Sequence, residues 1–255
     1  MSSGLYLHDT GEGRETLVLV HGFAGSHRIW DRVLPFLSAE LRVLAPDLPG
    51  HGRSLDLAGA GKAKACAAAV INALDERGVN HFHLAGHSFG GAVAVLMALQ
   101  VPERVKTLTL LAPGGFGPEI DGDILAQRAR ASDAKAMQAA LEAMMGQGKA
   151  VSQAMLDHAM QLAERAGQRE KLIEISDLIS HGGRQGAFPK AMLEALGMPV
   201  RVAWGTADAI LPVRQSDGLP SSFAVHRFEG LGHMLPEEAP QAMADLLSEA
   251  VDTSS

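Results

Sequence analysis

A glycine-flanked serine lies in the pentapeptide Gly86-His87-Ser88-Phe89-Gly90, between two apolar segments of the chain. The segment before it, residues 81–85, has the length of a strand, and the segment after it, residues 92–101, has that of a helix. A serine hydroxyl attacks a carbonyl well when it projects from a sharp turn, and glycine on both sides relieves the crowding in such a turn. The pattern therefore indicates a nucleophile, although an ordinary strand-to-helix turn can have the same form.

A serine nucleophile needs a base that takes its proton and a carboxylate that orients this base. Asp208 follows an apolar segment at residues 200–204, and His233 lies in a glycine-flanked loop after the segment at residues 223–228. Because the carboxyl ends of parallel strands meet at one edge of a sheet, we expect these two side chains to lie beside Ser88. The alternatives are an aspartate that caps a turn and a histidine on the surface.

The attack also needs hydrogen-bond donors for the negative charge that develops on the carbonyl oxygen. The backbone N–H of Phe89 is one candidate, because it lies at the start of the helix after Ser88. We predict that the second donor is the N–H of Phe23, in the loop His21-Gly22-Phe23-Ala24. The rings of both phenylalanines are also candidates to line the pocket.

The other histidines near these loops are predicted to have structural roles. His87 adjoins Ser88, but neighbouring residues on a tight turn point in different directions, so we do not expect His87 to act as the base. His21 and His51 are expected to position their loops. The histidine spacings do not match zinc motifs, and Cys66 is the one cysteine, in an alanine-rich helical segment. We therefore predict no metal, no other cofactor and no disulfide within the chain, with Cys66 as part of the core.

Apolar segments of five to seven residues predict the strands that position these groups, and several are continuously apolar, as in strands covered on both faces. Helical patterns separate most of them, so the β-α-β-α order predicts an α/β fold with a mostly parallel sheet flanked by helices. The predicted strands are residues 16–20, 41–46, 81–85, 105–111, 200–204 and 223–228, and the predicted helices are residues 29–37, 62–77, 88–101 and 236–247.

A long stretch with helical patterns and no predicted strand follows the segment at residues 105–111. We predict that residues 116–186 form a helical cap over the carboxyl edge of the sheet, inserted into a core made of residues 1–115 and 187–255. This cap would cover the serine.

Several side chains are candidates to contact the substrate, in addition to Phe23. Methionine is unbranched and polarizable, which suits varied apolar ligands, so Met137 and Met144 of the cap and Met234 beside His233 are candidates. The alternative is that the cap methionines pack the cap against itself. Arg184 is a further candidate for substrate binding.

Composition limits the partners that this chain can have. A length of 255 residues, with 47% hydrophobic residues, suits one α/β domain with an insertion. The net charge of −7, the absence of a Lys/Arg cluster and an aromatic content of 4% disfavour nucleic-acid binding. No apolar run approaches the about 18 residues of a membrane span, and residues 1–15 do not resemble a signal peptide, so we expect no membrane association and a cytoplasmic protein. The oligomeric state is left open.

The motifs resemble those of the α/β-hydrolase superfamily over nearly the whole chain. They are His21-Gly22 after a strand, Asp47-x-x-Gly50-x-Gly52-x-Ser54, the Ser88 pentapeptide, Asp208 and Gly232-His233. The chain order Ser, Asp, His is also that of this superfamily. The resemblance implies the α/β-hydrolase fold and a Ser-Asp-His catalytic triad.

Other stretches are similar to the hydrolase-fold domain of the acyltransferase component of bacterial acetoin dehydrogenase complexes. They are residues 111–120, Gly182-Gly183-Arg184-Gln185 and Gly218-Leu219-Pro220. That component usually begins with a lipoyl domain, whereas this sequence starts with the hydrolase fold.

The sequence thus predicts a carboxylesterase-like serine hydrolase that cleaves an ester, a thioester or a related carbonyl compound through an acyl-enzyme on Ser88. Its partner would be a small-molecule acyl substrate. An acyltransferase, a carbon–carbon bond hydrolase and a non-catalytic small-molecule binding protein of the same fold are alternatives, because the shared motifs do not distinguish among them.

Overall fold

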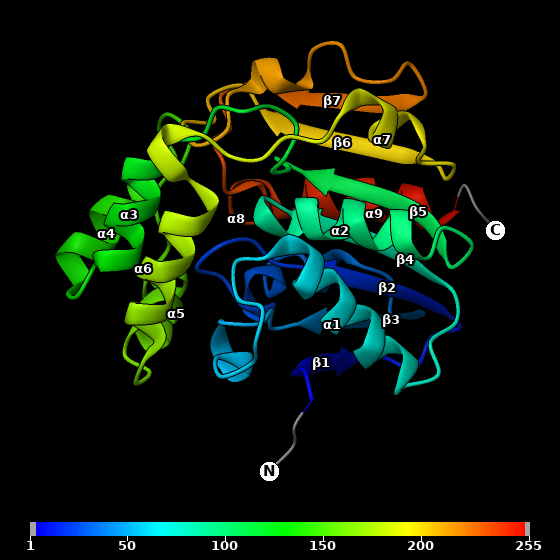
Figure 1. Ribbon diagram of the computed structural model, residues 1–255, viewed down its shortest axis with the longest axis horizontal. Coiled ribbons are helices and arrows are strands. Elements are labelled where there is room, and N and C mark those ends of the chain that lie inside the picture. Colours follow the sequence, from blue (N-terminus) through cyan, green and yellow to red (C-terminus); the bar gives the residue numbers. More distant parts are fainter. Residues whose placement is uncertain (1–3, 253–255) are drawn as a thin grey trace.

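The strands of the computed structural model, which describes residues 4–252, form one seven-stranded sheet (Figure 1). Its order is β1-β3-β2-β4-β5-β6-β7, and every neighbouring pair is parallel except β1 and β3. The predicted mostly parallel α/β sheet is therefore confirmed. The strands are β1 (Leu7–Thr10), β2 (Glu15–Val20), β3 (Leu41–Pro46), β4 (Phe82–His87), β5 (Val105–Leu111), β6 (Val200–Gly205) and β7 (Phe223–Phe228).

Helices cover both faces of the sheet, with α1 and α2 on one face and α9 on the other (Figure 1). Within residues 4–252, none of the helices combines the length and the apolar character that crossing a membrane requires. The α-helices are α1 (Ala63–Asp75), α2 (Phe89–Gln100), α3 (Gly122–Arg130), α4 (Ala134–Glu142), α5 (Gln153–Ala163), α6 (Gln168–Ile179), α7 (Lys190–Glu194), α8 (Leu235–Glu238) and α9 (Pro240–Asp252).

The four helices α3 to α6 come from one segment between β5 and β6, which we call the helical insertion (residues 116–186). They lie together beyond the carboxyl ends of the central strands (Figure 1). The strongest contacts among them join α3 to α6, and α4 packs on both α3 and α5. The insertion therefore stands at the sheet edge where ligands of open parallel sheets bind.

Three of the differences from the sequence-based expectation have a local reason, and α7 is a further helix that was not predicted. The predicted helix at residues 29–37 is two 3₁₀ turns, because Pro35 cannot donate the backbone hydrogen bond of a helix interior. Pro240 likewise separates α8 from α9, which we had expected as one helix. Strand β1 has four residues and a mostly polar sequence, so no apolar run predicted it.

The single cysteine lies in the core. Cys66, on α1, is fully buried, and burial raises the pKa of its thiol to about 12. At neutral pH it is therefore an uncharged thiol, as its expected packing role requires.

Asp47, at the end of β3, joins two loops that border the carboxyl edge of the sheet. Its Oδ1 accepts hydrogen bonds of 2.8 Å from both the backbone N and the Nδ1 of His27, and its Oδ2 accepts one of 2.8 Å from the N of Arg53. Burial by itself would raise the pKa of this carboxyl, but the hydrogen bonds from His27 and Arg53 outweigh it and lower the pKa to about 2. The aspartate is thus an ionised structural clamp.

We expect Asp47→Asn to destabilise the fold in a pH-dependent way. A carboxyl whose pKa falls on folding stabilises the protein at any pH above its unfolded value and loses this contribution as the pH falls toward its folded value. The shift corresponds to about 2 kcal/mol at pH 7. Urea unfolding should therefore show a gap between wild type and variant that is largest at neutral pH and narrows below about pH 4.

The exposed Asp56→Asn is the matched control and should change the free energy of unfolding by less than about 0.5 kcal/mol at each pH. A gap for Asp47→Asn that stays constant from pH 7 to pH 3.5 would contradict the pKa argument.

Candidate active site

Ser88 lies at the sharp turn between β4 and α2 and has a strained backbone, with φ 54° and ψ −122°. The turn brings the flanking residues so close that a Cβ at Gly86 would overlap the carbonyl of Gly90, and a Cβ at Gly90 would overlap the carbonyl of His21. Glycine is therefore required at both positions. A non-glycine residue in such a conformation is uncommon and clusters at functional sites.

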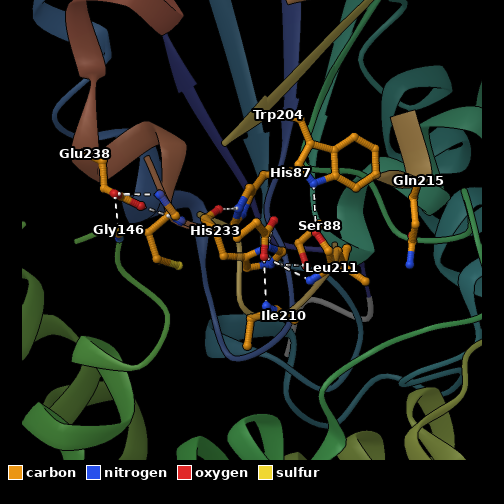
Figure 2. Close-up of polar contacts among 12 residues, drawn as sticks. His87, Ser88, Gly146, Trp204, Ile210, Leu211, Gln215, His233 and Glu238 are labelled. Atoms are coloured by element: carbon orange, nitrogen blue, oxygen red, sulfur yellow. Dashed lines mark hydrogen bonds and ion pairs between the residues drawn. The ribbon is translucent and has the colours of Figure 1, made fainter. Parts of the chain in front are cut away.

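Three side chains from three strand ends form one hydrogen-bonded row (Figure 2). The Oγ of Ser88 lies 2.8 Å from the Nε2 of His233, and the Nδ1 of His233 lies 2.8 Å from the Oδ2 of Asp208. Because the carboxylate can only accept, Nδ1 carries a proton and Nε2 is free to accept the serine proton. The His233 side chain is 1% exposed and the Asp208 side chain fully buried, so the row is shielded from water.

Asp208 has two roles, one for each carboxylate oxygen. Its Oδ1 accepts hydrogen bonds from the backbone N of Ile210, at 2.8 Å, and from that of Leu211, at 2.9 Å, which shapes the loop after β6. The indole N–H of Trp204 donates to the carbonyl of Leu211 at 2.9 Å and holds the far side of this loop (Figure 2). The turn-capping role that we weighed as an alternative thus coexists with the contact to His233.

Glu238, on α8, holds the loop that carries His233. Its Oε2 accepts hydrogen bonds of 2.9 Å from the backbone N of Gly232 and of Gly146, and its Oε1 accepts one of 3.0 Å from the N of Met234 (Figure 2). Gly146 belongs to the helical insertion. One carboxylate therefore fixes both sides of His233 and fastens the insertion to this loop.

His87 also supports His233 and does not replace it. The Nε2 of His87 donates to the carbonyl of His233 at 2.8 Å, while the backbone N of His233 donates to the carbonyl of Met144 at 2.9 Å. Burial lowers the pKa of His87 to about 3, with a contribution from His233, so the ring is neutral. The contacts of His87 are thus to the backbone of His233, and the contact to the Oγ of Ser88 belongs to His233.

The two predicted oxyanion donors flank Ser88. The backbone N–H groups of Phe23 and Phe89 have no hydrogen-bond acceptor among residues 4–252, and both residues line the cavity that contains Ser88. The next residue, Ala24, has a positive φ of 54°, which turns the loop after β2. Two free N–H groups beside the serine are the arrangement that an oxyanion needs.

Two cavities meet at Ser88. The larger, of about 460 Å³, lies between the core and the helical insertion, and its apolar wall includes Leu96, Leu178 and Phe188. The smaller, of about 50 Å³, is also lined by Ser88 and has His233 in its wall.

The cavities separate the predicted substrate contacts into two groups. Arg184 lines the larger cavity, Met144 and Met234 line the smaller one, and Phe23 lines both. Met137 lines neither, and its side chain is fully buried in the hydrophobic core. The structure therefore corrects the prediction for Met137 and supports the packing alternative for this residue.

Three residues near the site were not among the site residues predicted from the sequence. Glu238 clamps the His233 loop, and Gln185 accepts a 3.1 Å hydrogen bond from the backbone N of Gly115 at the rim of the larger cavity. Arg128 lines the smaller cavity. A signal existed for Arg128, because it follows the buried Leu125 at the i+3 spacing of a helix's apolar face. Within the described residues, no group of three His, Cys, Asp or Glu side chains is arranged to hold a metal ion.

Comparisons with known proteins agree with this architecture. The family model described as the alpha/beta hydrolase family matches residues 17–246, so the chain belongs to that family. It is 34% identical over 225 residues to the dihydrolipoyllysine-residue acetyltransferase component of the acetoin cleaving system of Cupriavidus necator, with coverage of 88% of this chain and 60% of the relative. The chain thus spans about three fifths of that relative's length.

A second relative is named a hydrolase, and a solved structure shares the fold of this chain. The 2-hydroxy-6-oxononadienedioate/2-hydroxy-6-oxononatrienedioate hydrolase of Cupriavidus pinatubonensis is 28% identical over 252 residues, which cover 93% of this chain and 87% of the relative. A meta-cleavage product hydrolase from Pseudomonas fluorescens superposes with a TM-score of 0.85 at 21% identity, covering 98% of this chain and 95% of the other. The expected fold and the resemblance to the acetoin acyltransferase component are therefore confirmed.

Proposed function

We propose that this protein is a serine hydrolase that cleaves a small ester, thioester or related carbonyl compound through an acyl-enzyme on Ser88. The observation that carries the proposal is the continuous hydrogen-bonded row Ser88–His233–Asp208 on a strained turn. Such a row lets a neutral imidazole remove the serine proton as the oxygen attacks.

Each half-reaction uses the same groups in reverse. The proton of Ser88 moves to the Nε2 of His233 while Oγ bonds to the carbonyl carbon, and the N–H groups of Phe23 and Phe89 stabilise the oxyanion. His233 then protonates the leaving group as its bond to the carbonyl carbon breaks. In the second half, His233 takes a proton from water, which attacks the acyl-enzyme, and returns the proton to Ser88 as the free acid departs.

The helical insertion completes the site as a cap in this proposal. Leu125 of α3 and Leu178 of α6 contribute to the wall of the larger cavity, opposite Ser88 and Phe89 of the core. A mostly apolar wall around a serine suits an apolar acyl or leaving group. Because α3 to α6 supply this wall, their side chains set the substrate range while the core supplies the chemistry.

A fluorophosphonate probe tests the nucleophile directly. We expect wild-type protein to be labelled on Ser88 and to turn over p-nitrophenyl esters of short acids, whereas Ser88→Ala should do neither. The exposed Ser221→Ala is the matched control and should be labelled like wild type. Labelling of Ser88→Ala to the wild-type extent would overturn the assignment.

Acyl transfer is the second candidate, because the relative with 34% identity is named an acetyltransferase component. A bound thiol or alcohol would then replace water in the second half-reaction. Product analysis with a competing thiol separates the two candidates: mostly free acid supports the hydrolase, and mostly the new thioester supports the transferase.

A further inference from the structure

A buried arginine in the wall of the smaller cavity has no carboxylate partner among residues 4–252. Arg128, on α3, is 4% exposed, and its Nη2 donates to the carbonyl of Ala24 at 3.1 Å. Its Nη1 is buried and has no acceptor among residues 4–252. Burial lowers the pKa of Arg128 to about 10, so the guanidinium is still protonated at neutral pH. Buried charges in proteins are ordinarily paired, which makes this cation unusual.

The other titratable groups around this cavity do not neutralise the arginine. Among the described residues, Glu237 is the one carboxylate in the wall, but its ion-pair partner is Arg32, at 3.7 Å. Burial raises the pKa of Glu237. His158 bonds through Nε2 to the Oγ of Ser26 at 2.8 Å. Burial lowers the pKa of His158 to about 4, helped by the charges of Arg28 and Arg128, so the His158 ring is neutral at pH 7.

A second buried polar atom belongs to the same wall. The Nδ1 of His87 has no hydrogen-bond partner among the residues that the structure describes. Because its Nε2 donates to the carbonyl of His233, Nδ1 is unprotonated and can only accept. The wall of this cavity of about 50 Å³ thus includes two residues, Arg128 and His87, that each have a buried polar atom without a partner among residues 4–252. The space fits a group of a few atoms.

The smaller cavity, with its polar wall, adjoins the serine that is proposed to react. Ser88, Phe23 and Leu125 line both cavities, so a carbonyl at Ser88 would have one substituent in the larger apolar cavity and the other beside Arg128. Guanidinium recognises a carboxylate better than any neutral group of the same size.

Resting on the proposed function, we infer that the smaller cavity is an anion subsite in which Arg128 binds a carboxylate of the substrate. The substrate class is then an acyl compound with a free carboxylate a few atoms from the reacting carbonyl, such as a monoester of a short dicarboxylic acid. The larger cavity takes the leaving group.

The alternative is that Arg128 only fastens α3 to the loop that carries Phe23 and Ala24. Loss of that fastening would slow every substrate to the same extent, because it disturbs the oxyanion donor. An anion subsite instead predicts a loss confined to substrates with the carboxylate. The two roles therefore differ in the ratio of kcat/KM values for a charged and an uncharged substrate of the same shape.

The test compares the p-nitrophenyl monoester of glutaric acid with p-nitrophenyl 5-methylhexanoate, its uncharged isostere, after subtraction of spontaneous hydrolysis. We expect Arg128→Gln to lower kcat/KM for the glutarate monoester about 10- to 100-fold and for the isostere less than about threefold. Arg128→Lys should recover part of the loss, because it keeps the charge. The exposed Arg130→Gln, on the same helix, is the matched control and should leave both values unchanged.

An equal decrease in kcat/KM for the two esters would overturn the subsite. Arg128 would then have only the structural role of holding α3 against the loop that carries Ala24. Calorimetric titration of glutarate into the wild type, Ser88→Ala and Arg128→Gln separates this inference from the proposed function. If neither ester is hydrolysed but glutarate binds to the first two proteins and not to Arg128→Gln, the anion subsite stands and the serine hydrolase fails. If glutarate binds to none, or equally to all three, the subsite is wrong.

Discussion

Replacing Ser88 and His233 together is expected to slow ester hydrolysis no more than replacing either one alone. Each single change to alanine should lower kcat on the order of 10⁴- to 10⁶-fold. The reason is the 2.8 Å contact between the Oγ of Ser88 and the Nε2 of His233. The serine is a weak nucleophile unless the imidazole takes its proton, and the imidazole has no proton to take once the serine is gone. The two side chains therefore act as one unit.

The measurement is kcat on p-nitrophenyl butyrate for the wild type, the two single variants and the double variant. The exposed His81→Ala is the matched control and should change kcat by less than about twofold. If the fold-decrease in kcat of the double variant equals the product of the two single decreases, Ser88 and His233 act independently. That result would contradict the proposed proton transfer.

The residues of this row could be predicted because each follows a strand end and carries a local mark. Ser88 has glycine on both sides, His233 follows Gly232, and Asp208 lies in the loop after an apolar strand. In a parallel sheet those three loops converge at one edge, so chain order and strand pattern together predict their proximity. The structure brings them together at hydrogen-bond distance.

The supporting contacts could not be predicted in this way, because they join residues that are far apart in sequence. Glu238 bonds to Gly146, 92 positions earlier, and Arg128 bonds to Ala24, 104 positions earlier. No local pattern specifies which carboxylate or guanidinium reaches which backbone group. The same holds for Met137, because a methionine on an amphipathic helix can face either a cavity or a neighbouring helix.

These long-range contacts join one segment, the helical insertion, to both parts of the proposed active site. Met144 and Gly146 of the helical insertion bond to the His233 loop or to its clamp, Glu238, and Arg128 bonds to the oxyanion loop. The insertion thus contacts the proposed base, His233, and Ala24, the neighbour of the proposed oxyanion donor Phe23. A substitution within it is therefore expected to change kcat as well as the substrate range.

Asp208→Asn is expected to lower kcat/KM about 10⁴-fold while it leaves the fold nearly as stable as in wild type. The asparagine oxygen can still accept the hydrogen bonds from the backbone N of Ile210 and of Leu211. Its NH₂ group then faces the Nδ1 of His233, which must become the acceptor. The ring proton moves to Nε2 and points at Ser88, so the histidine can no longer take the serine proton.

Comparison of Asp208→Asn with Asp208→Ala separates the two roles of this carboxylate. The asparagine variant removes only the contact that orients His233, whereas the alanine variant also removes the acceptor of the loop. Asp208→Ala should lower kcat/KM by about as much as Asp208→Asn. It should also lower the free energy of unfolding by about 3 kcal/mol, since the two buried N–H groups of Ile210 and Leu211 lose their acceptor. The measurements are kcat/KM on p-nitrophenyl butyrate and urea unfolding, with the exposed Asp217→Asn as the control. Activity of Asp208→Asn above about a tenth of wild type would refute the orienting role. Equal destabilisation by the asparagine and alanine variants would contradict the loop-holding role of Oδ1, because only alanine removes the acceptor of the loop.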